Sequence, residues 1–403
     1  MGADYALFLV GLSFASQSTI LPAFAAHLGA SNVIIGAIPA LMTLGWFLPS
    51  LPAAHHTRRL ARKLPLVLRY TAAERLPFLV LAILAFTTAE RAPAFTLAMT
   101  LVMLLVITST GGALMPAWLD VVAQAIPPAL RGRFFGLWSS LAGVGGLLGS
   151  FGTAWILARV APPAGYGWCF LVAAVFMGLS WVALVLVREG ESPSVPEALP
   201  LRGFLRLVLG ILKSDGNLAW FLVARACMGL AGMSSGFFTV HALRSLAAQD
   251  WQVGFFTSAF LAGQVVGNLA LGWLADRVGH RAVLMSGLLA TLGANVVALG
   301  ADSLEIYSLT FALSGINQAA ISVSAQTILL EFAKTAEERP TYVGLGNTAL
   351  APMLFGAPLL AGMMADTLGL PSVFALALVG ALLGTALFAW RVRNPAAPAG
   401  IGA

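Results

Sequence analysis

Long apolar runs alternate with short polar loops along the whole chain. Each run holds close to twenty residues, enough for a helix to cross about 30 Å of hydrocarbon at about 1.5 Å rise per residue. Backbone groups in lipid must be hydrogen-bonded within their own segment, and the alternating pattern of a barrel strand is missing, so the runs are predicted to be helices. We expect twelve membrane-spanning helices, near residues 4–26, 32–53, 65–88, 94–120, 134–159, 168–187, 217–243, 251–275, 282–301, 304–330, 342–366 and 370–390.

Composition supports an integral membrane protein. Hydrophobic residues make up 59% of the 403 residues and charged residues only 9%, whereas a soluble domain has about 25% charged residues. The net charge is +6, but the basic residues gather in loops on one side, and the other side holds only Arg91, Arg159 and Arg244. The positive-inside bias therefore predicts cytoplasmic N- and C-termini and explains the charge without nucleic-acid binding.

A long polar stretch, Arg188 to Asn217, divides the twelve spans into six and six. Within it, residues 201–213 have the pattern of an amphipathic helix on the inner membrane surface. The loops before the second and eighth spans resemble each other, as do those before the fifth and eleventh, which indicates a duplicated six-helix unit. We therefore predict an N-terminal bundle at 1–188, a cytoplasmic linker at 189–216 and a C-terminal bundle at 217–403.

One loop carries a specific signature between two apolar runs. Residues 272–281 read Gly-x-x-x-Asp-Arg-x-Gly-x-Arg, formed by Gly272, Asp276, Arg277, Gly279 and Arg281. This pattern resembles the cytoplasmic-loop signature of the major facilitator superfamily, the twelve-helix secondary transporters. The resemblance implies two pseudo-symmetric six-helix bundles around a central cavity, and alternating access to it. A solvated turn that merely follows charge bias is the alternative.

The resemblance also implies that the acidic residue of this loop latches the closed cytoplasmic gate. Asp276 is expected near the N-terminus of the eleventh span, where unpaired amides and the helix dipole stabilise a carboxylate. The matching loop of the first half keeps the basic residues Arg58, Arg59 and Lys63, but Arg58 occupies the position of the acid. We therefore expect the second half alone to hold the inner gate.

Two further loops pair an acid that ends one span with an arginine that opens the next. These pairs are Asp120 with Arg131 and Glu331 with Arg339. Each pair either belongs to a network of charges on the inner side of the membrane or is simply solvated at the ends of its two spans. The glycines of the fifth span resemble the antiporter motif of drug exporters but lack its Gly-Pro pair, so close helix packing explains them better.

Four ionisable side chains lie deep inside predicted spans, where each costs about 2.5 to 3.5 kcal/mol on insertion scales; they are Arg69, Glu74, Arg75 and Arg225. Glu74 and Arg75 lie near the midplane of the third span, on different sides of the helix, and the resemblance places this span at the periphery, where both would be structural. Glu74 is the only carboxylate expected at this depth, which makes it the leading proton carrier if protons drive transport. Arg225 in the seventh span suits either an anionic substrate, a gate pair or a structural role.

Neutral hydrogen-bonding groups on the spans expected to line the cavity suit a mostly apolar or amphipathic solute held by a few polar contacts. Some will instead bond to neighbouring helices. The candidates are Gln17, Ser109, Asn317, Gln318, Gln264 and Asn268.

The sequence therefore predicts a monomeric secondary transporter of a small solute in the cytoplasmic membrane, with proton-coupled efflux of an amphipathic compound as the preferred version. Uptake or uniport of a small anion, a membrane-embedded enzyme acting on a lipid-linked substrate, and a non-transporting receptor are the alternatives. No catalytic cluster, metal-ligand spacing or nucleotide-binding loop occurs, so we expect a non-enzyme without cofactor or metal.

Overall fold

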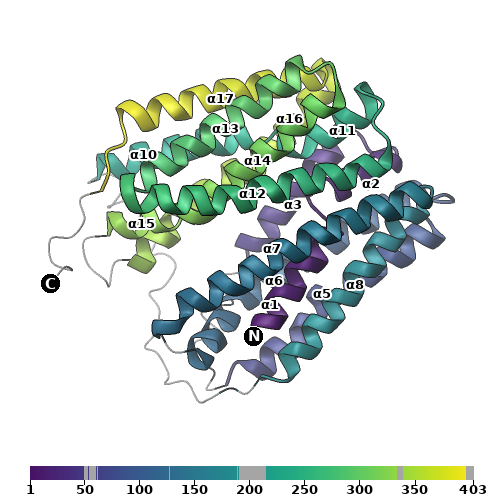
Figure 1. Ribbon diagram of the computed structural model, residues 1–403, viewed down its shortest axis with the longest axis horizontal. Coiled ribbons are helices and arrows are strands. Elements are labelled where there is room, and N and C mark those ends of the chain that lie inside the picture. The colour runs from purple at the N-terminus through teal and green to yellow at the C-terminus, as the bar shows by residue number, and fades with distance from the viewer. Residues whose placement is uncertain are drawn as a thin grey trace. The chain divides into compact units, whose positions relative to one another are not determined.

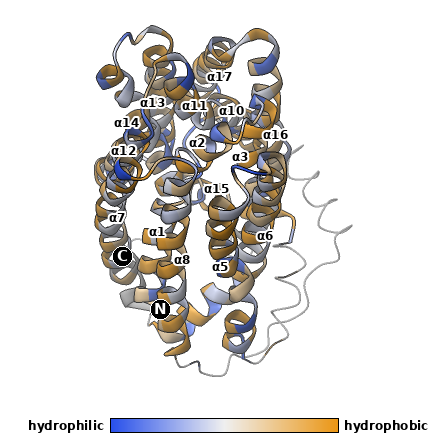
Figure 2. Cartoon of the chain, turned by 90° about the vertical axis from the view of Figure 1, so that its right-hand side faces the viewer, coloured by the Kyte–Doolittle hydropathy of each residue, from blue (hydrophilic) through white to orange (hydrophobic). Residues whose placement is uncertain are grey.

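The computed structural model describes residues 1–49, 53, 60, 62–126, 128–187, 189, 215–333 and 339–395, and its regular elements in these ranges are all helices (Figure 1). Hydrophobic residues dominate these helices (Figure 2). Among the described residues, 10 helical segments are long and apolar enough to cross a membrane, and Gly2–Ser13 and Asn32–Phe47 are shorter apolar helices. The prediction of an all-helical membrane protein is confirmed.

The helices form two compact units. Unit 1 comprises Met1–Ala198 and Thr239–Ser258, and unit 2 comprises Leu199–Phe238 and Ala259–Ala403. Unit 1 contains α1 (Gly2–Ser13), α2 (Ile20–His27), α3 (Asn32–Phe47), α5 (Leu64–Thr87), α6 (Pro93–Ala125), α7 (Pro128–Arg159) and α8 (Ala164–Val185). Unit 2 contains α10 (Gly216–Gly232), α13 (His280–Gly300), α14 (Leu304–Ser324), α15 (Thr327–Phe332), α16 (Arg339–Leu368) and α17 (Leu370–Trp390).

Two helices contribute residues to both units, namely α11 (Ser235–Ser245) and α12 (Asp250–Val278). The division at a central linker stays a prediction. Most of that linker, including its expected amphipathic helix at 201–213, lies outside the described residues, as do Arg58 and Arg59.

Three of the predicted spans are interrupted rather than continuous. A turn at residues 14–19 separates α1 from α2, residues 233–234 separate α10 from α11, and residues 325–326 separate α14 from α15. Each interruption contains Ser, Thr or Gln, whose side chains compete with the helical hydrogen bonds of the backbone. The apolar runs therefore locate these spans correctly but miss the breaks inside them.

Local sequence signals explain several helix ends. The side chains of Ser31, Asp215 and Ser303 accept hydrogen bonds from backbone amides in the first turns of α3, α10 and α14, at 3.4, 3.0 and 3.3 Å. These N-caps satisfy amides that have no partner within the helix. The tight turn between α12 and α13 uses Gly279 at φ 94°, a backbone conformation that favours glycine.

Small residues bring helices of unit 1 into close contact. Helix α1 packs against α7 and α8, and α5 packs against α6 and α8. A Cβ atom built at Gly145 or Gly149 of α7 would lie 2.5 Å from Val10 Cγ2 or 2.6 Å from Ser13 Oγ of α1. The glycines of the fifth predicted span therefore serve helix packing, as expected.

Candidate functional site

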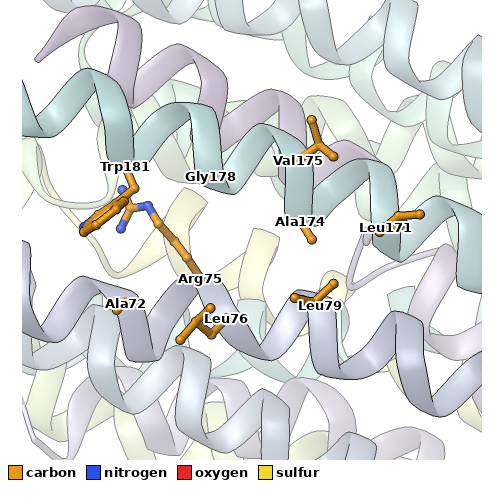
Figure 3. Close-up of a pocket in the computed structure, with 9 residues that line it drawn as sticks. All are labelled: Ala72, Arg75, Leu76, Leu79, Leu171, Ala174, Val175, Gly178 and Trp181. Carbon is orange, nitrogen blue, oxygen red and sulfur yellow. The ribbon is translucent and has the colours of Figure 1, made fainter.

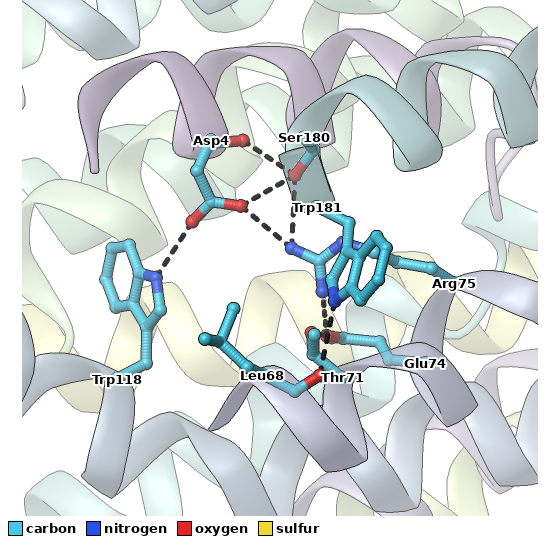
Figure 4. A network of polar contacts seen from close by, with 8 residues as sticks. All are labelled: Asp4, Leu68, Thr71, Glu74, Arg75, Trp118, Ser180 and Trp181. Carbon is cyan, nitrogen blue, oxygen red and sulfur yellow. Dashed lines mark hydrogen bonds and ion pairs between the residues drawn. The ribbon is translucent and has the colours of Figure 1, made fainter. Parts of the chain in front are cut away.

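A group of buried polar side chains surrounds Arg75 in unit 1 (Figure 4). Arg75 Nη2 donates to Asp4 Oδ1 at 2.8 Å and to Ser180 Oγ at 3.0 Å. Ser180 Oγ in turn donates to Asp4 Oδ1 at 2.6 Å. The side chains of Arg75 and Asp4 are only 8% and 3% exposed, so their attraction is screened far less than that of a surface pair. These contacts join α1, α5 and α8.

The second oxygen of Asp4 and the neighbouring acid extend this group. Trp118 of α6 donates from Nε1 to Asp4 Oδ2 at 3.0 Å. Glu74 Oε2 accepts from Arg75 Nη1 and from Thr71 Oγ1, both at 3.3 Å. We call the whole group the Arg75 cluster; it consists of Asp4, Thr71, Glu74, Arg75, Trp118 and Ser180.

Two expectations about Glu74 and Arg75 are corrected by this geometry. Adjacent positions do start from different sides of a helix, but the long arginine side chain reaches back and its Nη1 lies 3.3 Å from Glu74 Oε2. Glu74 is also accompanied by a second carboxylate, the buried Asp4, which contacts the same guanidinium. The sequence does not indicate Asp4 as a buried group, because a position in the first turn of the first helix is typical of a membrane surface.

Glu74 lies where three helices of unit 1 meet. A Cβ atom built at Gly111 of α6 would be 2.6 Å from Glu74 Oε1 and 3.1 Å from Trp46 Cζ3 of α3. The absence of a side chain at Gly111 therefore makes the room that Glu74 occupies.

An apolar groove of about 420 Å³ lies between α5 and α8, and Arg75 is one of the residues that line it (Figure 3). Arg75 contributes the only charged side chain to its lining, and Arg75 Nε has no hydrogen-bond partner among the described residues. The rest of the lining is apolar, apart from the indole nitrogen of Trp181 and backbone atoms, and consists of Ala72, Leu76, Leu79, Leu171, Ala174, Val175, Gly178 and Trp181.

Arg225, the deep arginine of unit 2, has very different surroundings. It is half-buried on α10, and its Nη1 lies 3.2 Å from the sulfur of Met228, one turn further along the helix. In the described part of the chain no carboxylate forms an ion pair with Arg225, and its Nε has no hydrogen-bond partner. The structural pairing that the sequence left open for Arg225 is not found among these residues.

Asn317 of α14 lies close to Met228. Asn317 Oδ1 is buried and has no hydrogen-bond partner within the described ranges. A Cβ atom built at Gly287 of α13 would lie 3.1 Å from Asn317 Oδ1 and 3.2 Å from Met228 Cε. Helices α10, α13 and α14 therefore meet around two polar atoms without a described hydrogen-bond partner, Arg225 Nε and Asn317 Oδ1. We call this group the Arg225 site; it consists of Arg225, Met228, Gly287 and Asn317.

The other neutral candidates are more scattered. Gln17 and Asn268 are exposed, and Ser109, Gln264 and Gln318 are half-buried. None of these five side chains forms a hydrogen bond with another residue that the structure describes. Their expected role in lining a cavity stays a prediction.

The signature loop is placed at the junction of α12 and α13. Arg281 Nε and Nη2 donate to the backbone oxygens of Phe388 and Ala389 at 2.8 and 2.7 Å, so Arg281 satisfies carbonyls at the end of α17. Arg277 stacks on Trp273, with its Cζ 4.0 Å from the ring centroid. Asp276 is exposed and pairs with no described residue. Its predicted role at the N-terminus of α16 stays a prediction.

The remaining inner charges find partners that the sequence did not indicate. Asp120 forms an ion pair with Lys63, and Glu331 lies 3.7 Å from Nε2 of His280. The side chains of Arg131 and Arg339, the expected partners, lie outside the described residues. Glu189 is the first residue of the predicted linker, yet its two carboxylate oxygens accept hydrogen bonds from the amides of Lys63 and Leu64, both at 2.7 Å. Glu189 therefore caps the start of α5.

Comparisons with known proteins give partial sequence matches and full-length structural matches. The chain is 31% identical over 107 residues to Solute carrier family 22 member 6 of Mus musculus, which covers 25% of this chain and 20% of the relative. The Rattus norvegicus protein of the same name is 30% identical over 107 residues, covering 25% of this chain and 19% of the relative. The chain thus aligns with about a fifth of the length of these curated relatives.

Solved structures resemble the chain over nearly its whole length. A D-xylose-proton symporter gives a TM-score of 0.68 at 12% identity and covers 98% of both chains. A nucleoside transporter gives a TM-score of 0.68 at 13% identity and covers 96% of this chain and 98% of its own. At these identities the likeness shows the fold. The sequence model of the Major Facilitator Superfamily matches residues 5–246 and 236–402, so the chain belongs to that superfamily, and its family and fold indicate secondary transport.

Proposed function

We propose that this protein moves a small solute across the cytoplasmic membrane by alternating access, driven by protons that bind at the Arg75 cluster. The observation that carries the proposal is that two carboxylates, the buried Asp4 and the partly buried Glu74, share one guanidinium. In this proposal the protein acts as a monomer, and the solute leaves the cytoplasm as protons enter, the direction that the sequence resemblance favours.

Charge balance supports a proton site in the cluster. With both carboxylates ionised, the six side chains hold one more negative than positive charge away from solvent, and an unbalanced buried charge is costly. The amino group of Met1 is a further cation near Asp4, but burial lowers its pKa, so it gives up its proton more readily than an exposed amino group. A proton on one carboxylate removes the imbalance and leaves an intact ion pair.

Glu74 is the carboxylate that we propose takes the proton. Asp4 accepts short hydrogen bonds from Arg75, Ser180 and Trp118. Among the described residues Glu74 accepts only two hydrogen bonds, both at 3.3 Å and both at the same oxygen, Oε2. Its negative charge is therefore stabilised by fewer and longer hydrogen bonds than that of Asp4.

The position of Glu74 supports a link between its charge and helix movement. Its Oε1 lies against Gly111 of α6, beside Trp46 of α3. Gain or loss of a charge there changes how α5 packs against two neighbouring helices of the same unit. Proton binding at Glu74 would in this way alter the preferred arrangement of unit 1, as coupling requires.

The test compares Glu74→Gln with the wild type in two measurements. Infrared spectra of the purified protein should show a protonated-carboxyl band that the wild type loses as pH rises and that the variant lacks. Vesicles carrying the protein should show solute-driven proton flux, which we expect Glu74→Gln to reduce at least tenfold while downhill solute exchange continues. The solute is taken from a thermal-stabilisation screen.

Glu90→Gln is the matched control, because Glu90 is an exposed acid of the same unit. It should leave both the infrared band and the proton flux unchanged. Proton flux in Glu74→Gln equal to that of the wild type would show that Glu74 does not carry the proton.

A further inference from the structure

We infer that the Arg225 site binds the transported solute, and that this solute is a small carboxylate that also carries a hydrogen-bond donor next to its carboxyl group. Hydroxy acids and amino acids have this chemistry. The inference rests on the proposed function to the extent that the bound molecule is transported, but binding itself is measured without transport.

The first step is the unpaired charge of Arg225. Arg75 and Arg225 both lie on membrane-spanning helices, but Arg75 is neutralised by two carboxylates of its own unit. Arg225 instead contacts the sulfur of Met228, a weak and neutral acceptor. A guanidinium has five N–H donors arranged to bind a carboxylate in a bidentate manner. An anionic ligand is therefore the partner that Arg225 lacks among the described residues.

The second step is the unused acceptor of Asn317. Its Oδ1 is buried without a partner in the described part of the chain, although buried polar groups are nearly always hydrogen-bonded in folded proteins. An acceptor needs an O–H or N–H group opposite it, which a simple carboxylate does not supply. The ligand must therefore combine a negative charge with a donor.

The third step is that the guanidinium of Arg225 and the side-chain oxygen of Asn317 belong to the same cluster of residues. The sulfur of Met228 contacts Arg225. The Cε atom of Met228 and the Oδ1 atom of Asn317 both lie within 3.2 Å of the point where a Cβ atom would stand at Gly287. The same point is 2.6 Å from the Cβ of Ala320, so only glycine fits there without displacing these side chains. Arg225 and Asn317 are therefore linked through Met228 and Gly287, which are both apolar, so that the cation and the acceptor belong to one group of residues.

The binding test uses four probes of nearly equal size with the purified full-length protein, at fixed pH and ionic strength. Lactate and alanine carry both a carboxylate and a donor, propionate lacks the donor, and lactamide lacks the charge. Thermal stabilisation as a function of concentration gives the apparent Kd of each probe. We expect lactate or alanine to bind at least tenfold more tightly than propionate, and lactamide to give no stabilisation.

Two substitutions assign the two features to their residues. Arg225→Gln should raise the Kd for lactate and propionate alike by at least tenfold, and Arg225→Lys should recover part of that loss. Asn317→Leu should remove the preference for lactate over propionate while leaving the affinity for propionate unchanged. Arg159→Gln, which removes a cation that stacks on Trp155 in unit 1, should change none of these values.

Each contrary result counts against the inference. Equal stabilisation by lactate and lactamide, an unchanged Kd in Arg225→Gln, or no stabilisation by either donor-bearing acid would overturn it. Glu74→Gln should lose proton coupling but bind lactate normally. Unchanged coupling in Glu74→Gln with normal lactate binding would count against the proton site alone. Loss of coupling in Glu74→Gln together with no lactate binding by the wild type would count against the Arg225 site alone.

Discussion

Asp4 is the carboxylate of the cluster that lies nearest to the guanidinium of Arg75, at 2.8 Å against 3.3 Å for Glu74. It accepts hydrogen bonds from Arg75, Ser180 and Trp118, and so connects α1 to three other helices. Removing one partner of a buried ion pair typically costs about 3 to 5 kcal/mol, because the remaining charge stays buried. Glu74 is close enough to offset part of that cost.

We therefore expect Asp4→Asn to lower the free energy of unfolding by about 3 kcal/mol. Ser180→Ala is the matched change, since it removes a hydrogen-bonding partner of the same two residues without altering charge and should cost only about 1 kcal/mol. Denaturation of the purified variants in detergent measures both values. If Asp4→Asn proves as stable as Ser180→Ala, the ion pair does not carry the stability assigned to it.

The ends of helices depend on a few side chains of neighbouring elements. Arg281 donates to the carbonyls of Phe388 and Ala389 and so completes the end of α17. Glu189 accepts from the first amides of α5. In both cases a charged group meets the helix end of opposite partial charge, an arrangement that stabilises a helix by about 0.3 to 1 kcal/mol per group and more when partly buried.

For Arg281→Gln we expect faster amide hydrogen exchange at the end of α17 and a loss of stability of about 1 kcal/mol. The exchange is read by mass spectrometry on peptides that contain residues 385–392. Arg277→Gln is the control, because Arg277 belongs to the same loop but stacks on Trp273 instead of contacting α17. Equal exchange in the two variants would mean that Arg281 does not hold this helix end.

The helices were predictable from the sequence because burial in lipid imposes a simple pattern on about twenty residues at a time. The breaks at residues 14–19, 233–234 and 325–326 were not, since averaging over a whole span hides a local change in hydrogen bonding. Glu74, Arg75 and Arg225 stood out as charges within apolar runs. Their partners did not, because whether Asp4 meets Arg75 depends on how α1 packs against α5 and α8.

At the scale of the whole molecule, a role of the signature loop in the transport cycle stays a prediction. Asp276 is exposed and makes no ion pair with a described residue, and the superfamily resemblance implies that it latches the closed cytoplasmic gate. If it does so, its contribution belongs to one conformation of the cycle only. Its loss should then shift the balance between conformations without weakening either bundle.

We expect Asp276→Asn to shift the population away from the state closed on the cytoplasmic side by up to about tenfold, corresponding to roughly 1.4 kcal/mol, with the unfolding temperature unchanged. Distances between spin labels on the two halves report this balance. Asp302→Asn, which alters another exposed acid of unit 2, should leave the distances as in the wild type. An unaltered distribution in Asp276→Asn would exclude the latch.

The buried ion pair at Asp4 has a practical consequence for handling this protein. Because the counter-ion of Arg75 stands in the first turn of α1, proteolysis that removes the first few residues would strip a carboxylate from the interior of unit 1 while leaving the apolar helices intact. Such trimmed material would still enter micelles and run as a membrane protein. Intact mass at the N-terminus is therefore the quality check that preparations need before any transport measurement is interpreted.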